Sequence, residues 1–159
     1  MISFGWYQIT IEAPRETVWS FVARIEKLNL WWPARFQATG VLREGQELSV
    51  MVRMPRTEVM QADVMQEVCA LIDQLDPPCR VVFLQRQPDS NKPIGRNLLT
   101  LEDTPRGCRV RVRMFVQMRL MLICPLTWVI SLLLNSVWPF THLSPLYKLK
   151  RLVHQEVFG

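Results

Sequence analysis

The stretch YQITIEAPRETVWSFVARI, residues 7–25, decides the fold because its hydrophobic period changes at one proline, Pro14. Before Pro14, apolar and polar residues alternate, which is typical of a half-buried strand. After Pro14, apolar residues recur every three or four positions, which is typical of a helix, and proline is favoured in a first helical turn. The sequence therefore predicts a strand over residues 3–13 and a helix over residues 14–24.

Further along the chain, the pattern predicts a second short helix over residues 26–30, closed by Trp31-Trp32-Pro33. Alternating apolar residues then predict antiparallel strands separated by polar turns that contain glycine or proline. The alternation is cleanest in the last of them, where valines and Met114 face one way and three arginines the other. The expected strands cover two short runs within 36–54 on either side of the turn 43–46, then 67–75, 80–86, 94–102 and 108–118.

The segment 56–75 fits two structures. Apolar residues such as Met60 and Val64 recur at helical spacing, so the local pattern favours a helix. Its later half, 67–75, also fits a strand that leads into the turn Asp76-Pro77-Pro78. We keep the strand for this later half and leave the helix open as the alternative.

Residues 125–158 are helical by pattern, with an interruption at Pro139 and a restart at Ser144-Pro145, a favourable N-cap and first-turn pair. The order of elements is a strand, two short helices, a run of antiparallel strands and a long terminal helix, which predicts an α+β fold. No linker composition interrupts the chain, and 159 residues with 49% hydrophobic content suffice for one core. We therefore expect a single domain over residues 1–159.

Four short motifs resemble the START-like superfamily, specifically its polyketide cyclase/dehydrase (SRPBCC) branch. They are ITIEAPRETVWSFV (Ile9 to Val22), the WWP segment, LDPPCRVVF (Leu75 to Phe83) and TPRGCRVRV (Thr104 to Val112). The last two are similar to the "DPPRR" turn and the "GTRV" strand entry of that branch, and the resemblance spans the whole chain. It implies a helix-grip fold, in which a curved antiparallel sheet wraps around a long C-terminal helix. It also implies a cavity that holds lipids, isoprenoids, hormones or polyketides.

Each alternating strand of such a sheet should turn one face toward the cavity. The resemblance also places the Trp-Trp-Pro segment near the cavity mouth, so Trp32 is either core packing or a gate that contacts ligand. For a gate, Trp32→Ala should weaken binding of a hydrophobic probe more than it destabilises the fold. The predicted ligand-binding residues are Tyr7, Trp32, Phe36, Val50, Val52, Phe83, Leu99, Val112, Met114, Val116, Val129, Ile130 and Leu133, and the same assignment adds Leu48 and Leu126 to the cavity wall.

The sequence predicts no catalytic residue, no metal site and no cofactor. It contains no glycine-rich phosphate loop, no nucleophile elbow and no zincin motif. The polar candidates on inward faces are Tyr7, read as a buried tyrosine with a satisfied hydroxyl, and Asp73, read as facing solvent. The four cysteines form no C-x-x-C pair, and His142 and His154 lie far from all of them in sequence.

Three functions stay open on these grounds. The first is a carrier or sensor of a hydrophobic small molecule, which is the leading hypothesis. The second is a polyketide cyclase or dehydratase, which would need a convergent pair of titratable groups in the cavity. The third is a protein-interaction module built on the same fold.

The net charge and the hydropathy of the chain indicate which binding partners to expect. The net charge of +5 is not clustered with exposed aromatics, so we expect no nucleic-acid binding. Residues 120–141 carry no charge and reach the length of a membrane span, and 125–140 is apolar around most of a helix. We expect this segment to contact an anionic membrane surface, helped by Lys148, Lys150 and Arg151, or to bury itself in a homodimer; a true span is the rival hypothesis. The thiols and the lack of a signal-peptide pattern predict a cytoplasmic protein, with membrane association as one alternative for this helix.

Overall fold

One antiparallel sheet of seven strands forms the body of the described structure. The computed structural model describes residues 2–54, 64–86, 92–116 and 145–159, and residues 145–158 form a C-terminal helix. The remaining elements are, in chain order, β1 (Ile2–Ile11), α1 (Arg15–Ala23), α2 (Ile25–Leu28), β2 (Arg35–Phe36), β3 (Glu47–Met54), β4 (Val64–Asp76), β5 (Arg80–Arg86), β6 (Pro93–Thr104) and β7 (Gly107–Val116).

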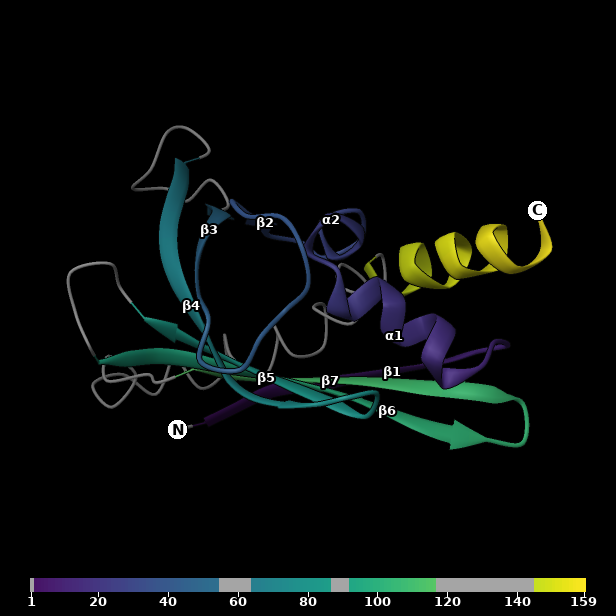
Figure 1. The fold of residues 1–159 in the computed structure, drawn as a ribbon. Coiled ribbons are helices and arrows are strands. Elements are labelled where there is room, and N and C mark those ends of the chain that lie inside the picture. The colour runs from purple at the N-terminus through teal and green to yellow at the C-terminus, as the bar shows by residue number, and fades with distance from the viewer. Residues whose placement is uncertain (1, 55–63, 87–91, 117–144) are drawn as a thin grey trace.

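The strand order is β1-β7-β6-β5-β4-β3-β2, so consecutive strands from β2 to β7 are neighbours and β1 returns to pair with β7. Figure 1 shows that β3 and β4 bend away from the other strands, which curls the sheet. The three helices lie on its concave side (Figure 1). This is the helix-grip architecture and the α+β class that the sequence predicts, with two short helices after the first strand.

The hydrophobic core fills the space between the concave face and the helices. A row of paired residues crosses four strands: Val81 of β5, Leu99 of β6, Val112 of β7 and Tyr7 of β1. On the side opposite the sheet, the helices contribute apolar side chains to the core. These recur at helical spacing, as expected for a surface helix with one apolar face. These are Val18, Phe21 and Val22 from α1, Ile25 and Leu28 from α2, and Leu146, Leu149 and Val153 from the C-terminal helix.

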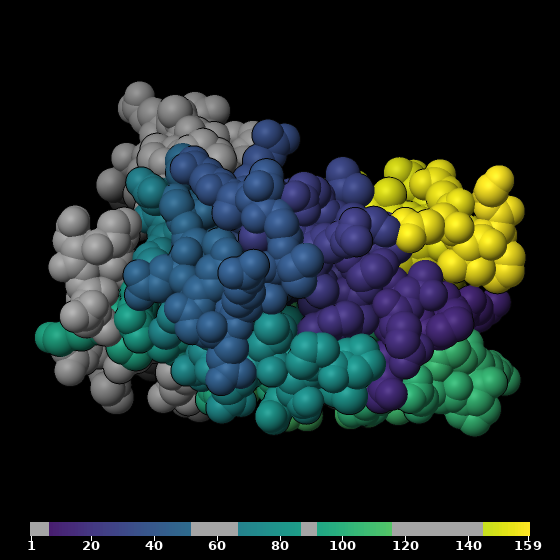
Figure 2. Space-filling model, viewed as in Figure 1, coloured from purple at the N-terminus to yellow at the C-terminus, as the bar shows by residue number. Residues whose placement is uncertain are grey.

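The C-terminal helix is fixed to the N-terminal half of the chain. It lies against α1 and α2 at one end of the molecule in Figure 2. Lys27 of α2 forms an ion pair with Glu156, with Nζ 2.6 Å from Oε2, and its ammonium also lies 4.3 Å from the centre of the Phe21 ring. The terminal helix and the short helices therefore form one layer over the sheet.

The convex face is polar, as the alternating arginines of β7 predict. Arg111 approaches Glu102 of β6 at 2.9 Å and the Gln8 side chain of β1 at 3.3 Å. Arg96 of β6 lies 3.5 Å from Asp73 of β4, which is exposed as expected. Such solvated pairs add little stability each, but they keep the convex face in water and the apolar face inward.

Strand β4 lies where the local sequence pattern favoured a helix. The helical spacing that favoured a helix over 56–75 was wrong for residues 64–75, which belong to β4. The strand pairs with β3 on one side and β5 on the other, with a register shift between Ile72 and Gln74. Two-sided pairing satisfies its backbone groups and overrides the local pattern. Residues 56–63 lie outside the described residues.

Smaller differences concern element ends. Pro14 is the N-cap residue of α1 and the helix begins at Arg15, one residue later than predicted. Helix α2 is shorter than the predicted 26–30. Strand β2 ends at Phe36, so a longer connection than the predicted turn leads to β3; it contains Gly45 at φ +76°, where a positive φ was expected.

The uncharged stretch 120–141, with the apolar segment 125–140 inside it, lies outside the described residues. Among the helices that the structure does describe, none is both long and apolar enough to span a bilayer. Contact with a membrane surface or a second copy through that segment stays a prediction.

Candidate functional site

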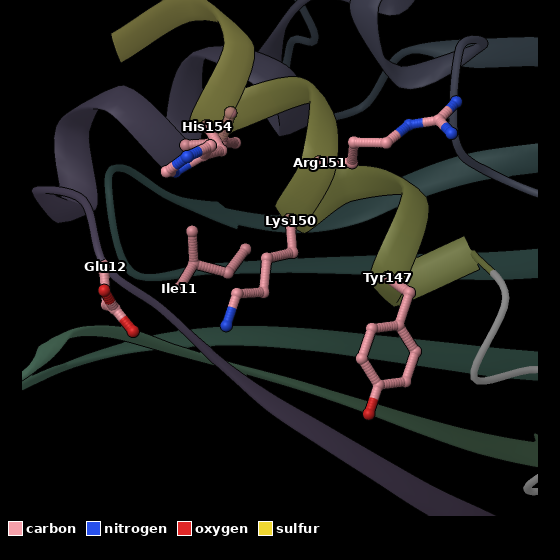
Figure 3. Close-up of a pocket in the computed structure, with 7 residues that line it drawn as sticks. Ile11, Glu12, Tyr147, Lys150, Arg151 and His154 are labelled. Carbon is pink, nitrogen blue, oxygen red and sulfur yellow. The ribbon is translucent and has the colours of Figure 1, made fainter. Parts of the chain in front are cut away.

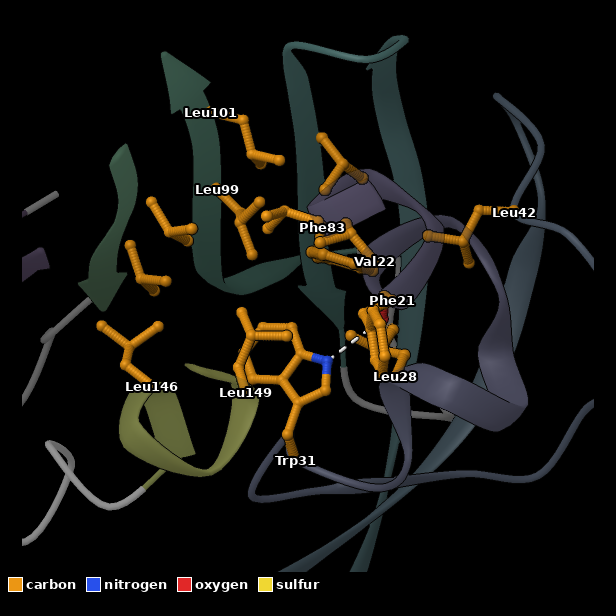
Figure 4. Packing of buried hydrophobic residues seen from close by; sticks show 14 of the residues in the cluster. Phe21, Val22, Leu28, Trp31, Leu42, Phe83, Leu99, Leu101, Leu146 and Leu149 are labelled. Atoms are coloured by element: carbon orange, nitrogen blue, oxygen red, sulfur yellow. Dashed lines mark hydrogen bonds between the residues drawn. The ribbon is translucent and has the colours of Figure 1, made fainter. Parts of the chain in front are cut away.

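The two adjacent tryptophans at the end of α2 have different surroundings. Trp31 is 2% exposed, and its indole N–H donates a hydrogen bond to the Phe21 carbonyl at 3.0 Å (Figure 4). Trp32 is partly exposed, and its indole N–H has no hydrogen-bond partner among the described residues. Its ring meets the edge of Trp31 at 5.3 Å and the Phe83 ring at 5.8 Å. Core packing therefore describes Trp31, whereas Trp32 faces the interior space.

Two small, partly open spaces, called the internal spaces below, lie on the concave face, and Trp32 borders both. The first, of about 20 Å³, is lined by Tyr7, Trp31, Trp32, Pro33, Val112, Met114, Pro145 and Leu146. The second, of about 10 Å³, is lined by Trp32, Ala34, Phe36, Val50, Val68, Ala70, Phe83, Gln85 and Asn97. Each volume is close to that of a single water molecule. As they stand, neither space has room for a molecule larger than water.

Many of the predicted ligand-binding residues come together at these two spaces. Leu99 and Leu48 are buried in the core and border neither space. The side chains of Val52 and Val116 lie outside the described residues, as do Leu126, Val129, Ile130 and Leu133. The predicted residues that border one space or both are Tyr7, Trp32, Phe36, Val50, Phe83, Val112 and Met114.

Two polar side chains on this face, Asn97 of β6 and Gln85 of β5, are not among the residues predicted from the sequence. Asn97 is 6% exposed and is the one buried polar residue in the described part of the chain. The alternation of β6 could have indicated that Asn97 faces inward, because Asn97 shares a face with Leu99 and Leu101. Asp73, the other polar candidate named from sequence besides Tyr7, lies on the outer surface, as expected.

The titratable groups near the core are held in their neutral forms. Burial raises the pKa of Tyr7 above its usual value. The Cys108 thiol is fully buried, and burial, with a smaller contribution from the charge of Asp103, raises its pKa to about 11. A thiol of this kind stays protonated at neutral pH and is a poor nucleophile. Cys69 and Cys79 are also free thiols, and the described residues contain no cluster of three or more metal-ligating side chains.

A larger space of about 580 Å³ forms an open surface groove between the end of β1 and the C-terminal helix. Figure 3 shows that the charged ends of Lys150, Arg151 and His154 point in different directions. An open groove with dispersed charges neither shields an apolar ligand nor converges on an anion. The concave face is therefore the better candidate site despite its smaller volume.

A comparison with protein-family models shows to which family the chain belongs. Residues 12–120 match the family model described as Activator of Hsp90 ATPase homolog 1-like protein. The chain belongs to this family. The family is part of the START-like (SRPBCC) superfamily, which confirms the resemblance drawn from the motifs. A search of curated proteins found no significant match.

Solved structures of other proteins have the same fold. Protein CV1439 from Chromobacterium violaceum has 15% identity and a TM-score of 0.62, over 94% of this chain and 95% of that chain. Protein MLL2253 from Mesorhizobium loti has 13% identity and a TM-score of 0.63, over 95% and 96%. DynU16, a protein in the dynemicin biosynthetic locus, has 16% identity and a TM-score of 0.60; the match covers 96% of this chain and 46% of DynU16.

The Activator of Hsp90 ATPase homolog 1-like family and its superfamily share a fold suited to hydrophobic ligands. In this chain the face that such a fold turns toward its ligand carries aliphatic side chains, the ring cluster Trp32–Phe83–Phe36 and two amides. No charged side chain borders either internal space among the described residues. The lining of the site is therefore apolar apart from neutral polar groups.

Proposed function

We propose that the protein binds a hydrophobic small molecule between the concave face of the sheet and the C-terminal helix, as a carrier or sensor. The observation that carries this proposal is the position of Trp32. Trp32 borders both internal spaces, and its ring is held by ring contacts, without a hydrogen bond to any described residue. Displacement of this one side chain joins the spaces into a single apolar site.

Two further observations support small-molecule binding. The wall around Trp32 is aromatic and aliphatic, with the Phe36 and Phe83 rings 5.8 Å apart, as in ligand pockets generally. DynU16 shares the fold and is placed by its description in a biosynthetic locus, where small molecules are made. The cyclase or dehydratase alternative has less support, because amides and a tyrosine with a raised pKa do not exchange protons near neutral pH.

The proposal predicts that filling the second space abolishes binding. Ala70 of β4 is 4% exposed and borders this space. We expect wild-type protein to bind the neutral dye Nile red with a rise in fluorescence, and Ala70→Phe to weaken this binding at least about tenfold, because the new ring occupies the site. Overpacking should cost only about 1–3 kcal/mol of stability, measured by urea denaturation.

The matched control is Ala38→Phe. Ala38 also packs against the core but borders neither internal space. This variant should keep wild-type affinity for the dye. Equal dye affinity in wild type, Ala70→Phe and Ala38→Phe, or no dye binding by the wild type, would contradict the proposed function.

A further inference from the structure

We propose that Asn97 and Gln85 recognise a neutral hydrogen-bonding group, a carbonyl or a hydroxyl, on an otherwise apolar ligand. This inference rests on the proposed function and names the chemistry of its ligand. It follows from where the two amides lie and from two features of the described residues around them: none is a hydrogen-bond partner of either amide, and none that borders the space is charged.

The two amides lie close together across adjacent strands. Asn97 of β6 is paired with Phe83 of β5, and Gln85 is paired with Gly95, two residues before Asn97. Diagonal neighbours of this kind have side chains on the same face, about 7–8 Å apart at the backbone. Both border the second internal space, together with Trp32 and Phe83. A polar atom between the two side chains would be within reach of both.

Within the described part of the chain, both amides are free of hydrogen bonds. Asn97 and Gln85 make no hydrogen bond to any described residue, although Asn97 is 6% exposed. Asn29, by contrast, is an asparagine with a structural role, because both ends of its amide are hydrogen-bonded within the protein. Its amide nitrogen donates to the Phe36 carbonyl at 3.0 Å, and its oxygen accepts from the Phe36 N–H at 2.8 Å. An amide held in an apolar wall without a protein partner stabilises little by itself, so a ligand that supplies the partner is a physical reason to place it there.

Gly95 holds room for the Gln85 amide. A Cβ atom at this position would lie 2.8 Å from the Gln85 Oε1 atom and 3.1 Å from the Phe115 carbonyl oxygen. Gly95 does not have a positive φ, so its backbone conformation does not require glycine. The missing side chain instead lets the Gln85 amide lie against the sheet, beside the space that Asn97 borders.

The surroundings select a neutral group. The arginines next to the amides face the other side of the sheet, where Arg86 lies 3.6 Å from Glu47 and Arg96 lies 3.5 Å from Asp73. A carboxylate or an ammonium in the internal space would lose its hydration without gaining a counter-charge. A side-chain amide offers both a donor and an acceptor, so it suits a carbonyl and a hydroxyl alike.

Three probes that share one ring system test the inference at pH 7: naphthalene, 2-naphthol and 2-naphthoate. Wild-type protein should bind 2-naphthol about tenfold more tightly than naphthalene, from one or two neutral hydrogen bonds, and 2-naphthoate most weakly. Asn97→Leu should remove the preference for 2-naphthol, keep the affinity for naphthalene and raise the Tm of the ligand-free protein. Gly95→Ala, which displaces the Gln85 amide, should reduce the same preference.

Asn29→Leu is the matched control and should lower the Tm while the order of probe affinities stays unchanged. A fall in Tm for Asn97→Leu comparable to that of Asn29→Leu would assign Asn97 a structural role and overturn the inference. Equal wild-type affinities for naphthalene and 2-naphthol would overturn it while the proposed function stands. Failure of wild type to bind any of the three probes would contradict the proposed function and the inference together.

Discussion

Trp31→Ala is expected to lower the free energy of unfolding by about 3–5 kcal/mol, measured by urea denaturation. The side chain is 2% exposed and lies in the core formed by all three helices and the sheet. Truncation leaves a cavity and also deprives the Phe21 carbonyl of its hydrogen bond from the indole. The two losses add in the same direction.

Trp32→Ala is the natural comparison, because it removes the same side chain one residue later. Trp32 is partly exposed and its indole N–H has no partner in the described structure, so we expect a smaller loss of stability. Its ring is a wall of both internal spaces, so binding of Nile red should weaken clearly. Equal losses of stability in the two variants, with dye affinity unchanged in Trp32→Ala, would show that both tryptophans are core residues.

Gly107→Ala is expected to destabilise the protein by more than about 3 kcal/mol, since a strained backbone conformation and a collision with backbone atoms combine. Gly107 has φ +119° and begins β7 at the turn that follows Thr104. An added Cβ would overlap the Ile11 carbonyl oxygen and lie 2.9 Å from the Ala13 nitrogen. Backbone atoms cannot move aside as a flexible side chain can, so the β1–β7 pairing must shift.

Gly45→Ala is the control for the conformational part of this effect. Gly45 also has a positive φ, +76°, but nothing lies within 4 Å of its added Cβ. Alanine there should cost only about 1–2 kcal/mol. Thermal and urea denaturation of both variants separate the two causes. A Gly107→Ala variant no less stable than Gly45→Ala would show that the sheet edge yields easily.

The order and type of most elements follow from local pattern. The change of period at Pro14 predicts β1 and α1, and strict alternation predicts β7, because these patterns report one buried face directly. Strand β4 was harder to predict, since its apolar spacing also fits a helix. Its state depends on pairing with β3 and β5, which lie at a distance along the chain.

The candidate site was predictable only in outline. Alternation indicates which strand residues face inward, and many of them do border the internal spaces. The sequence does not distinguish Trp31 from Trp32, because the difference depends on which indole reaches the Phe21 carbonyl. The sequence also does not single out Asn97. Whether its amide has a hydrogen-bond partner depends on which residues surround it in the folded protein.

The central claim, that this face of the sheet holds an apolar small molecule, is tested most directly by native mass spectrometry of the protein purified from the organism that produces it. The account predicts a population of chains that carry one neutral, apolar species, released by organic solvent and missing from Ala70→Phe prepared in the same way. Wild-type protein found entirely at the mass of the bare chain under gentle conditions, with no species extracted by solvent, would contradict it.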